Sequence, residues 1–310
     1  MRKIIGMGET ILDILFKDGQ PVAAVCGGSS FNSIVSVGRA GFPCAFVGYT
    51  GGDLVGKRTI DFMHENHIST EFFEQRAKEK SAISLAFLSK EGDANYQFYK
   101  EIPRSNLNFP TPQVGKSDVL LYGSYYACCE GMRPQVERML RCMQEAQGIV
   151  YYDLNFRRSH AHELEALLPA IHQNMEMSTI VRGSADDFEV MYNTRYSNEI
   201  YEKHIRSHCP IFVCTAGEGI IVVHTPTEKI EYQAPRIENV VSTVGAGDNF
   251  NAGFVCSLLH QDIKQEELQN LSTEKWKRIL KDACAFAGEA CKTTENYISE
   301  KFGHDYFQSL

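Results

Sequence analysis

Near the end of the 310-residue chain stands the stretch Ser242-Thr243-Val244-Gly245-Ala246-Gly247-Asp248-Asn249-Phe250-Asn251-Ala252-Gly253-Phe254. Glycines flank an alanine, an acid follows, and apolar residues then recur at helical spacing, which predicts a tight loop that enters a helix. A helix N-terminus presents free N–H groups and about half a positive charge, and small residues let an anion come close to them. Gly245, Ala246 and Gly247 are therefore predicted to form an anion hole for a phosphoryl group that gains charge in a transition state.

Asp248, directly after this loop, has two interpretations. A carboxylate in the first turn of a helix is an ordinary cap for the free N–H groups. Because the acid follows a loop of phosphate size, it is also placed to accept the proton of an attacking hydroxyl, a task in phosphoryl transfer that depends mainly on position. The stretch lacks the GK[ST] of a Walker A loop and is not a GxGxxG fingerprint, so neither of these nucleotide-binding motifs explains it.

The rest of the chain alternates short apolar runs with amphipathic segments. Most of the apolar runs lack alternation of polar and apolar residues, which is typical of strands buried on both faces. The amphipathic segments repeat apolar residues every three or four positions, and the first of them closes at Gly41, as many helices do. This order predicts an α/β fold with a parallel sheet and helices on both faces. The predicted strands are Ile4–Gly8, Cys44–Gly48, Val119–Tyr122, Ile149–Asp153, Thr179–Arg182 and Ile211–Thr215.

One region breaks this alternation. Ala82–Leu88 and Asn95–Lys100 are strand-like runs separated by a polar turn, which predicts a β-hairpin. Val22–Val25 is a candidate for a further strand beside it. The sequence contains no linker rich in Gly, Ser or Pro and no internal repeat, so we interpret the hairpin as an appendage on one α/β body.

The composition excludes several classes of protein. Lys and Arg total 31 and Asp and Glu total 39, so the net charge is −8, whereas a protein that neutralises nucleic-acid phosphates needs a cationic face. No apolar run reaches the ~18 residues that a membrane span requires, and the first residues lack the apolar stretch of a signal peptide. We therefore expect no nucleic-acid or membrane partner and a cytoplasmic location. The ten cysteines include no CxxC pair, which favours buried, reduced thiols over disulfides or a metal site.

Two further motifs stand ahead of the loop quoted above. They are Gly8-Glu9-Thr10-Ile11-Leu12-Asp13 and Gly27-Gly28-Ser29-Ser30-Phe31-Asn32-Ser33, the latter leading to Gly41. In this order, and with Gly245–Asp248 as the last, the motifs resemble the ribokinase/PfkB family of carbohydrate kinases over essentially the whole chain. The resemblance implies a ribokinase-like three-layer α/β/α fold with a mostly parallel central sheet. It also implies a single kinase domain over residues 1–310, with a small β-strand lid built from about 14–27 and 80–115.

The resemblance assigns roles to the residues of these motifs. Asp248 would be the general base, and Gly245–Gly247 would stabilise the transferred phosphoryl group. Asp13 would hydrogen-bond to sugar hydroxyls, Gly28 would let the sugar approach the backbone, and Asn32 would add a polar contact. From the residues alone, Asp13 could cap a turn, Gly28 could belong to that turn and Asn32 could be an ordinary first-turn helix residue.

The ATP and Mg²⁺ sites correspond to weaker matches. The run Thr215-Ala216-Gly217-Glu218-Gly219 is similar to the family's T-x-G-x-x-G nucleotide loop, with Gly219 one residue early, and by itself it equally predicts a strand–turn–strand hairpin. Ser184-Ala185-Asp186-Asp187 stands where the family usually has N-x-x-E, which orders Mg²⁺ through water. Ser242 replaces the aspartate that commonly opens the last motif, so activation by a monovalent cation such as K⁺ stays open. The implied cofactor contacts are ATP at Ser184, Thr215, Gly217 and Gly219, and the metal, through water, at Asp187.

One run bears on which sugar is used. Asp153-Leu154-Asn155-Phe156-Arg157 closes an apolar strand and resembles the D-x-N-x-R of fructokinases and 2-keto-3-deoxygluconate kinases, which places Asn155 among the sugar contacts. An arginine at a strand end can donate paired N–H bonds to a carboxylate or phosphate. We therefore expect Arg157 to face the sugar acid, the transferred phosphoryl group or ATP, with a structural salt bridge as the alternative. Tyr122-Gly123-Ser124 ends the preceding strand where fructokinases tend to have Gly-Ser and ribokinases a glutamate.

These motifs predict an ATP- and Mg²⁺-dependent kinase that phosphorylates a primary hydroxyl of a small sugar, with fructose first and 2-keto-3-deoxygluconate second. The predicted hairpin would be a lid over the sugar, with Phe98 and Tyr99 either touching the sugar or packed within the sheet. Exposed strand edges of such a lid would allow two chains to pair as a homodimer. The alternatives are a nucleoside kinase on the same fold and a catalytically silent sugar-sensing protein. The intact Gly-Ala-Gly-Asp run speaks against the sensor.

Overall fold

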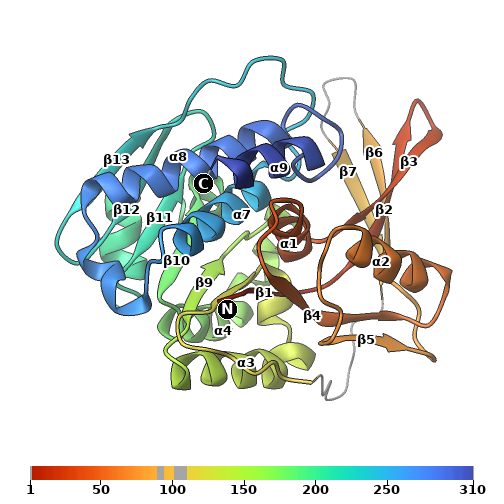
Figure 1. Ribbon diagram of the computed structural model, residues 1–310, viewed down its shortest axis with the longest axis horizontal. Helices are drawn as coiled ribbons and strands as arrows, with labels where there is room; N and C mark the ends of the chain where they lie inside the picture. The colour runs from red at the N-terminus through yellow and green to blue at the C-terminus, as the bar shows by residue number, and fades with distance from the viewer. Residues whose placement is uncertain (1, 89–93, 101–109, 310) are drawn as a thin grey trace.

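The structure is a computed structural model that describes residues 2–88, 94–100 and 110–309. Within these residues, one central sheet of nine strands runs through the molecule (Figure 1). The order of its strands is β13 (Lys229–Gln233), β12 (Ile220–His224), β11 (Phe212–Thr215), β10 (Ile180–Ser184), β9 (Ile149–Asp153), β8 (Val119–Gly123), β1 (Ile4–Met7), β4 (Cys44–Gly51) and β5 (Phe73–Arg76). The strands from β11 to β5 are all parallel, and β12 and β13 extend one edge as antiparallel strands. All six predicted strands are confirmed.

Both faces of this sheet are buried. Successive residues of a strand point to opposite faces, so Ile4 packs into the apolar cluster on one side and Ile5 into the cluster on the other. Phe46 and Val47 divide in the same way, and all four side chains are fully buried. This double burial explains why the strands read as continuous apolar runs in the sequence.

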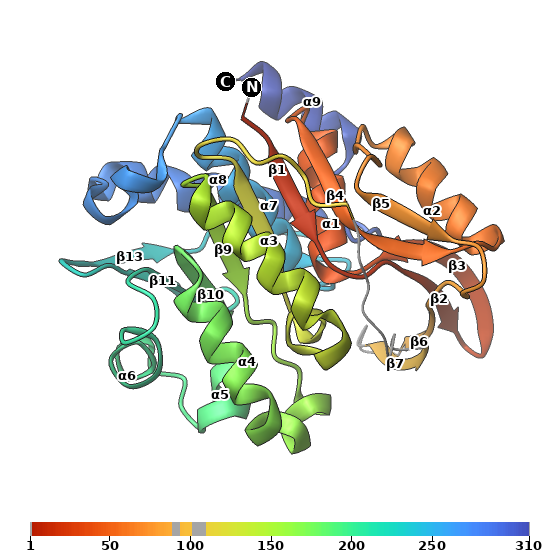
Figure 2. The ribbon, with the colours of Figure 1, turned by 90° about the horizontal axis from the view of Figure 1, so that it is seen from below.

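Helices cover the two faces as separate layers, so the predicted α/β/α layering is confirmed (Figures 1 and 2). One layer contains α1 (Ser29–Arg39), α2 (Leu54–Glu65), α7 (Ala246–His260), α8 (Thr273–Ala290) and α9 (Glu300–Gln308). The other contains α3 (Arg133–Glu145), α4 (Leu164–Glu176), α5 (Ala185–Tyr192) and the short α6 (Ser197–Ile200). Single turns of 3₁₀ or π helix cover Tyr125–Cys128, Glu130–Met132, Arg158–Glu163, Tyr201–Ile205 and Gln265–Asn270.

A second, four-stranded sheet stands at one end of the molecule (Figure 1), and we call it the small sheet. Its strands lie in the order β3 (Gln20–Gly27), β2 (Ile11–Lys17), β6 (Ile83–Leu88) and β7 (Ala94–Tyr99). The pairs β2–β3 and β6–β7 are antiparallel and β2–β6 is parallel. The predicted hairpin is confirmed as β6 and β7, and Val22–Val25 lies in the further strand β3, which β2 separates from the hairpin. Two parts of the range predicted for the lid, 89–93 and 101–109, lie outside the described residues.

Three strands of the central sheet were not predicted from the sequence. β5 and β13 lie at the two edges. β5 carries three polar residues after Phe73 and is ordered mainly by backbone pairing with its one neighbour. β13 alternates between exposed and more buried residues, so its sequence did contain a strand signal, which was missed. β12 pairs antiparallel with β11, so the strand–turn–strand interpretation of residues 215–219 is the observed local structure.

The strand order reverses beside β1. The chain passes from β1 outward to β4 and β5, and the later strands from β8 to β11 are added on the other side of β1. In open parallel sheets, ligands bind at the carboxyl ends of the strands where the order reverses. The predicted site segments follow the carboxyl ends of β1, β8, β9 and β10, so the topology brings them to one edge of the sheet.

Two expectations from composition can be compared with the structure. All ten cysteines are free thiols, and eight of them are buried, as expected of reduced cysteines in an apolar core. Across the described ranges, no helix is both long enough and apolar enough to cross a bilayer.

Candidate active site

The segment Gly245–Asp248 forms the turn that begins α7. Gly245 adopts φ 79°, in the left-handed region that favours glycine, and a Cβ atom there would lie 3.0 Å from the backbone oxygen of Asn296. The N–H of Ala246 bonds to the oxygen of Thr243 at 3.2 Å. Among the described residues, the N–H groups of Gly247 and Asp248 have no acceptor. The turn thus offers free amides to an anion, although the amide of Ala246 is already used.

A buried asparagine fixes this turn. Asn249 Nδ2 donates to the oxygens of Gly245 and Asn296, at 2.8 and 2.9 Å. Its Oδ1 accepts from Ser36 Oγ of α1 at 2.5 Å. Because the Asn249 side chain is fully buried, these bonds hold the turn rigidly against α1, as an anion hole that acts without reorganising requires.

Asp248 is buried against the first turn of α1. Its Oδ1 accepts from Ser29 Oγ at 2.9 Å and its Oδ2 accepts from Asn32 Nδ2 at 2.8 Å. Burial raises the pKa of Asp248 to about 6, while these two hydrogen bonds and the charge of Arg157 oppose the rise. The carboxylate therefore has the raised proton affinity that suits a general base near neutral pH.

Gly28 and Asn32 lie at the start of α1, next to Asp248. Gly28 adopts φ 127°, and a side chain there would overlap the backbone oxygen of Glu9, so only glycine fits the approach of these two segments. Asn32 is buried, and its Oδ1 has no hydrogen-bond partner in the described part of the chain. A buried acceptor without a donor is costly, and a ligand hydroxyl would satisfy it.

Asp13 lies on β2 at the base of the small sheet. Its Oδ1 accepts a short hydrogen bond from Ser84 Oγ of the neighbouring β6. Burial raises the pKa of Asp13 to about 6, and the bond from Ser84 and the charge of Arg157 oppose the rise. The charge of Arg157 lowers the pKa of both Asp13 and Asp248, so Arg157 lies within electrostatic range of both carboxyl groups.

Two aromatic residues of the small sheet lie on the same face as Asp13. Phe98 pairs in register with Ser84, which bonds to Asp13, so Phe98 lies on the same face of the sheet as Asp13. Phe98 is 52% exposed, so it is not packed into the small sheet. Tyr96 lies two positions earlier on β7 and stacks on Phe98, with ring centroids 5.8 Å apart. Tyr99, the other predicted lid contact, lies on the opposite face of the sheet from Phe98, because successive residues of a strand point to opposite faces.

Tyr96 is a site residue that sequence reasoning missed. Burial raises its pKa, and the charged groups that act on it are Asp13, Arg157 and Asp248. Tyr96 thus lies within electrostatic range of all three charged residues of the candidate site. The period-2 alternation of the predicted strand, which places residues 96 and 98 on one face, was the signal that could have identified it.

Arg157 follows the carboxyl end of β9. In the part of the chain that the structure describes, it makes no hydrogen bond or ion pair, so the alternative of a structural salt bridge is not observed. Asn155 adopts φ 38°, and it lines a small cavity together with Ser124, His160 and Arg157. The loop therefore presents a free cation beside Asp13 and Asp248, and an amide on a neighbouring cavity.

Ser184 and Asp187 form a capping box at the start of α5. Ser184 Oγ accepts from the N–H of Asp187 at 3.1 Å, and Asp187 Oδ2 accepts from the N–H and the Oγ of Ser184 at 2.6 and 2.8 Å. These bonds give both residues a structural role. Asp187 Oδ1 has no hydrogen-bond partner among the described residues.

The donor set allows one kind of metal contact. In the described segments, no group of three or more His, Cys, Asp or Glu side chains is arranged to hold a metal ion directly. Magnesium usually keeps several waters and binds through one or two carboxylates together with substrate phosphates. One unbonded carboxylate oxygen on Asp187 fits a contact to hydrated Mg²⁺ through water and does not fit a site for the bare ion.

The predicted nucleotide loop is the turn between β11 and β12. Gly217 adopts φ 56° with open space around it, and the N–H of Gly219 bonds to the oxygen of Ala216 at 2.9 Å. Thr215 is buried, and its Oγ1 accepts from Arg182 at 2.8 Å. The turn lies at the same sheet edge as α7, while Thr215 is used inside the protein.

A second arginine at this edge was not predicted. Arg182, on β10, is buried and donates from Nη1 to Asp153 Oδ1 at 2.9 Å. Asp153 Oδ2 accepts from Asn251 Nδ2 of α7 at 2.7 Å. The criterion that selected Arg157, an arginine where a buried strand ends, applies equally to Arg182 and would have found it.

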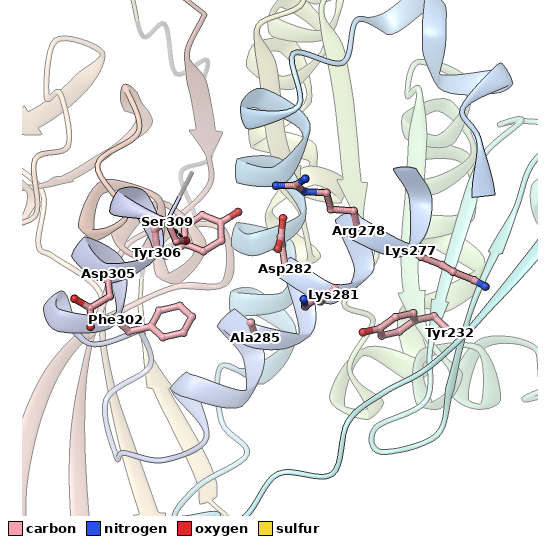
Figure 3. Close-up of a pocket in the computed structure, with 10 residues that line it drawn as sticks. All are labelled: Tyr232, Lys277, Arg278, Lys281, Asp282, Ala285, Phe302, Asp305, Tyr306 and Ser309. Carbon is pink, nitrogen blue, oxygen red and sulfur yellow. Dashed lines mark hydrogen bonds between the residues drawn. The ribbon is translucent and has the colours of Figure 1, made fainter. Parts of the chain in front are cut away.

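A separate groove of about 780 Å³ lies between β13, α8 and α9 (Figure 3). Phe302 and Tyr306 of α9 point toward α8. Lys277 and Lys281 of α8 also line the groove, as does Asp282, which accepts from Ser257 Oγ at 2.7 Å. None of its lining residues is a predicted site residue, so this groove is distinct from the candidate active site.

The geometry can now be compared with known proteins. The sequence profile described as pfkB family carbohydrate kinase matches residues 7–301. The chain belongs to the pfkB family of carbohydrate kinases. It is a phosphotransferase that acts on a sugar hydroxyl, as the family assignment and its relatives show.

Two relatives illustrate what this pfkB kinase is similar to. Aminoimidazole riboside kinase of Salmonella typhimurium is 25% identical over 263 residues, which cover 83% of this chain and 81% of the relative. A fructokinase of Rhizobium leguminosarum is 24% identical over 263 residues, which cover 82% of this chain and 79% of the relative. Both alignments extend over most of the two proteins compared.

Solved structures share the fold of this pfkB kinase. Aminoimidazole riboside kinase from Salmonella enterica, complexed with aminoimidazole riboside and an ATP analog, has a TM-score of 0.82, 20% identity and 99% coverage of each chain. Fructokinase from Vibrio cholerae, with fructose, ADP and calcium ion bound, has a TM-score of 0.82, 18% identity and coverage of 96% of this chain and 94% of its own. These likenesses confirm the predicted ribokinase-like fold.

Proposed function

We propose that this pfkB kinase transfers the γ-phosphate of ATP to a primary hydroxyl of a small sugar, with Asp248 as the general base. The observation that carries the proposal is the position of Asp248. It is buried at the N-terminus of α7, directly beside free backbone amides, and oriented by Ser29 and Asn32. A base and an anion site therefore meet at one point, which in-line phosphoryl transfer requires.

The sugar would lie between the small sheet and α1. Asp13 would accept sugar hydroxyls, the unpaired Oδ1 of Asn32 would accept another, and Gly28 would allow close approach to the backbone. The face of the small sheet that carries Phe98 and Tyr96 would cover the sugar. Covering it excludes water, which would otherwise compete for the phosphoryl group.

Transfer would begin when Asp248 accepts the hydroxyl proton. The hydroxyl oxygen then bonds to the γ-phosphorus and the bond to the β-phosphate oxygen of ATP breaks, so ADP leaves. The amides of the Gly245–Asp248 turn would stabilise the charge on the transferred group. Arg157, which has no internal partner, would pair with that group or with ATP.

ATP would bind along the loops at the carboxyl edge of the sheet. We place its phosphates and ribose near Ser184 and near the turn with Thr215, Gly217 and Gly219. Asp187 would hold hydrated Mg²⁺ through a water, and the ion would supply charge neutralisation for the phosphates. The position of Ser242 leaves K⁺ as a further cofactor to test.

We propose fructose as the first substrate and 2-keto-3-deoxygluconate as the second. The D-x-N-x-R run and the fructokinases among the relatives support this order. A riboside is the second candidate function, because an aminoimidazole riboside kinase has the same fold and a similar sequence.

A panel of acceptors tests the proposal through ADP release with ATP and Mg²⁺. The panel contains fructose, 2-keto-3-deoxygluconate, ribose, tagatose, adenosine, inosine and aminoimidazole riboside. We expect the highest kcat/KM with fructose. A higher kcat/KM with a riboside than with fructose would make the riboside the proposed substrate. Background turnover with all of them, together with a sugar-dependent rise in Tm, would favour the sugar-sensing protein.

A further inference from the structure

Arg182 is a permanently charged residue buried behind the anion site. Its side chain is 8% exposed, and its charge cannot be removed at physiological pH. It lies on β10 near the middle of the central sheet, in register with Asp153 of β9. The phosphoryl transfer proposed above uses Asp248, the turn amides and Arg157, and it leaves the buried charge of Arg182 without a function.

The guanidinium packs directly against the first turn of α7. A Cβ atom built on Gly247 would lie 3.3 Å from both Nη1 and Nη2 of Arg182 and 3.7 Å from its Cζ. Because both terminal nitrogens are nearer than Cζ, the Nη1–Nη2 edge of the guanidinium faces Gly247. The ring of Phe250, one turn further along α7, has its centroid 5.8 Å from the same Cζ. The cation is thus enclosed by the helix whose N-terminus forms the anion site.

Hydrogen bonds fix this cation from the sheet side. Nη1 donates to Asp153 and Nη2 donates to Thr215, so three neighbouring strands, β9 to β11, are tied to one side chain. Asp153 is itself bonded to Asn251 of α7. The Nε of Arg182 is buried and has no partner in the described residues, so only the two terminal nitrogens hold the guanidinium, through their bonds to β9 and β11.

We propose that Arg182 is the positioning residue of the anion hole. Its guanidinium holds the Gly247 turn against the strand ends, and its pairing with Asp153 sets the charge that Asp248 and the transferred phosphoryl group experience. The proposal rests on the proposed function, because it assigns Arg182 a part in the same phosphoryl transfer.

Several charged groups surround Asp248, and the pH dependence follows from their balance. Asp153 raises the pKa of Asp248, and Arg157 lowers it. Arg182 faces the same turn from β10, while Asp13 and Tyr96 face the site from the small sheet. Removing Arg182 leaves the charge of Asp153 uncompensated, so Asp248 should hold its proton to higher pH. Removing the charge of Asp153 should have the opposite effect.

The test compares Arg182→Met, Arg182→Lys, Asp153→Asn and the double variant Arg182→Met/Asp153→Asn. For Arg182→Met we expect kcat to fall ~10- to 100-fold with the KM for the sugar nearly unchanged. The acid limb of the pH–rate profile should move to higher pH in Arg182→Met and to lower pH in Asp153→Asn. In the double variant it should lie near its wild-type position. Arg182→Lys should keep the wild-type acid limb and lose part of kcat.

Arg39 provides a matched control. Its side chain is 9% exposed and bonds to Asn66, Glu295 and the oxygen of Ile298 at the far end of α1. Arg39→Met should lower Tm and leave kcat and the acid limb in place. If Arg182→Met behaves in the same way, Arg182 is only structural and the proposal is overturned.

A second readout separates this proposal from the proposed function. The titration of the Asp248 carboxyl carbon, followed by ¹³C NMR, should shift upward in Arg182→Met and downward in Asp153→Asn, whether or not turnover is measured. If Arg182→Met fails to fold, the titration of Asp248 in Asp153→Asn and Arg182→Lys still tests the proposal. An unmoved titration in folded variants overturns the role of Arg182, whereas a wild-type protein that releases no ADP with any acceptor overturns the kinase reaction.

Discussion

Asp248 has to lose its proton before it can accept one from a hydroxyl. Burial makes that loss harder, while the hydrogen bonds from Ser29 and Asn32 make it easier, and the balance leaves a pKa of about 6. At pH 7 the Asp248 carboxyl is therefore ionised in most molecules, and it binds a proton more readily than the carboxylate of an exposed aspartate does. This combination is what a general base requires.

Asp248→Asn should separate activity from stability. We expect kcat to fall ~10²–10⁴-fold with little change in the KM for the sugar. The folded-state pKa lies above the ordinary value of 3.8, so the ionised side chain costs stability, and the cost grows as pH rises from about 4 to about 6. The neutral amide removes this cost. At pH 7.5 the Tm of the variant, measured by calorimetry, should equal or exceed that of the wild type. Near-normal turnover would exclude Asp248 as the base.

The acid limb of the rate should involve two carboxylates. Burial raises the pKa of Asp13 and of Asp248 to about 6 in each case, and we propose that both act in the ionised form. Below pH 6, log kcat/KM should therefore rise with a slope approaching two and become level above about pH 7. In Asp13→Asn the slope should fall to one at a lower maximal rate. A slope of one in the wild type would remove Asp13 from the ionising groups.

At the scale of elements, the start of α5 carries a capping box, and we propose that Asp187 of this box contacts hydrated Mg²⁺. Ser184→Ala removes the cap hydroxyl and should cost about 1 kcal/mol of unfolding free energy, measured by denaturant unfolding without Mg²⁺. Asp187→Asn should in addition raise the Mg²⁺ concentration that gives half-maximal rate, because Oδ1 loses its charge. The serine variant is the matched control. Equal Mg²⁺ requirements in the two variants would leave Asp187 as a cap alone.

The sequence predicted the strands and helices whose pattern reflects two-sided burial. Six parallel strands were predictable because they are continuous apolar runs buried on both faces, and α1, α2, α7 and α8 were predictable because apolar residues recur at helical spacing. The edge strand β5 was not, because it is mostly polar and its order comes from backbone pairing with β4. β13 was missed although its polar and apolar residues alternate.

The individual residues of the candidate site were predictable from the sequence, but their contacts with one another were not. The motifs supplied Asp13, Asn32 and Asp248. That Asn32 binds Asp248, or that Arg182 lies under Gly247, depends on how distant segments pack. No local spacing carries that information.

At the scale of the whole molecule, the proposed function requires a protein with net charge −8 to bind an anionic nucleotide. In the proposed site, backbone amides, Arg157 and the buried Arg182 would supply the positive potential locally. Binding of ATP should consequently weaken only moderately with added salt, because amides and a buried cation are screened less than surface charges.

Pairing of two small sheets is a prediction at this scale. Phe87 stacks on Phe16 and is 43% exposed, on the face of the small sheet opposite Asp13. We propose that this face pairs with a second copy. Phe87→Lys should convert a dimer to a monomer in sedimentation velocity. Tyr196→Lys, which changes an exposed aromatic residue outside the small sheet, should not. A wild-type monomer at micromolar concentration would contradict the prediction.

The bond between Asn32 and Asp248 joins positions 216 residues apart. Contacts between distant segments form late, because the intervening chain must first be ordered. Early intermediates, with local helices and hairpins in place, would still lack a base oriented by α1. After dilution from denaturant, turnover should therefore return more slowly than the far-ultraviolet circular dichroism signal. Enzymatic activity would then report the last step of refolding and not the first.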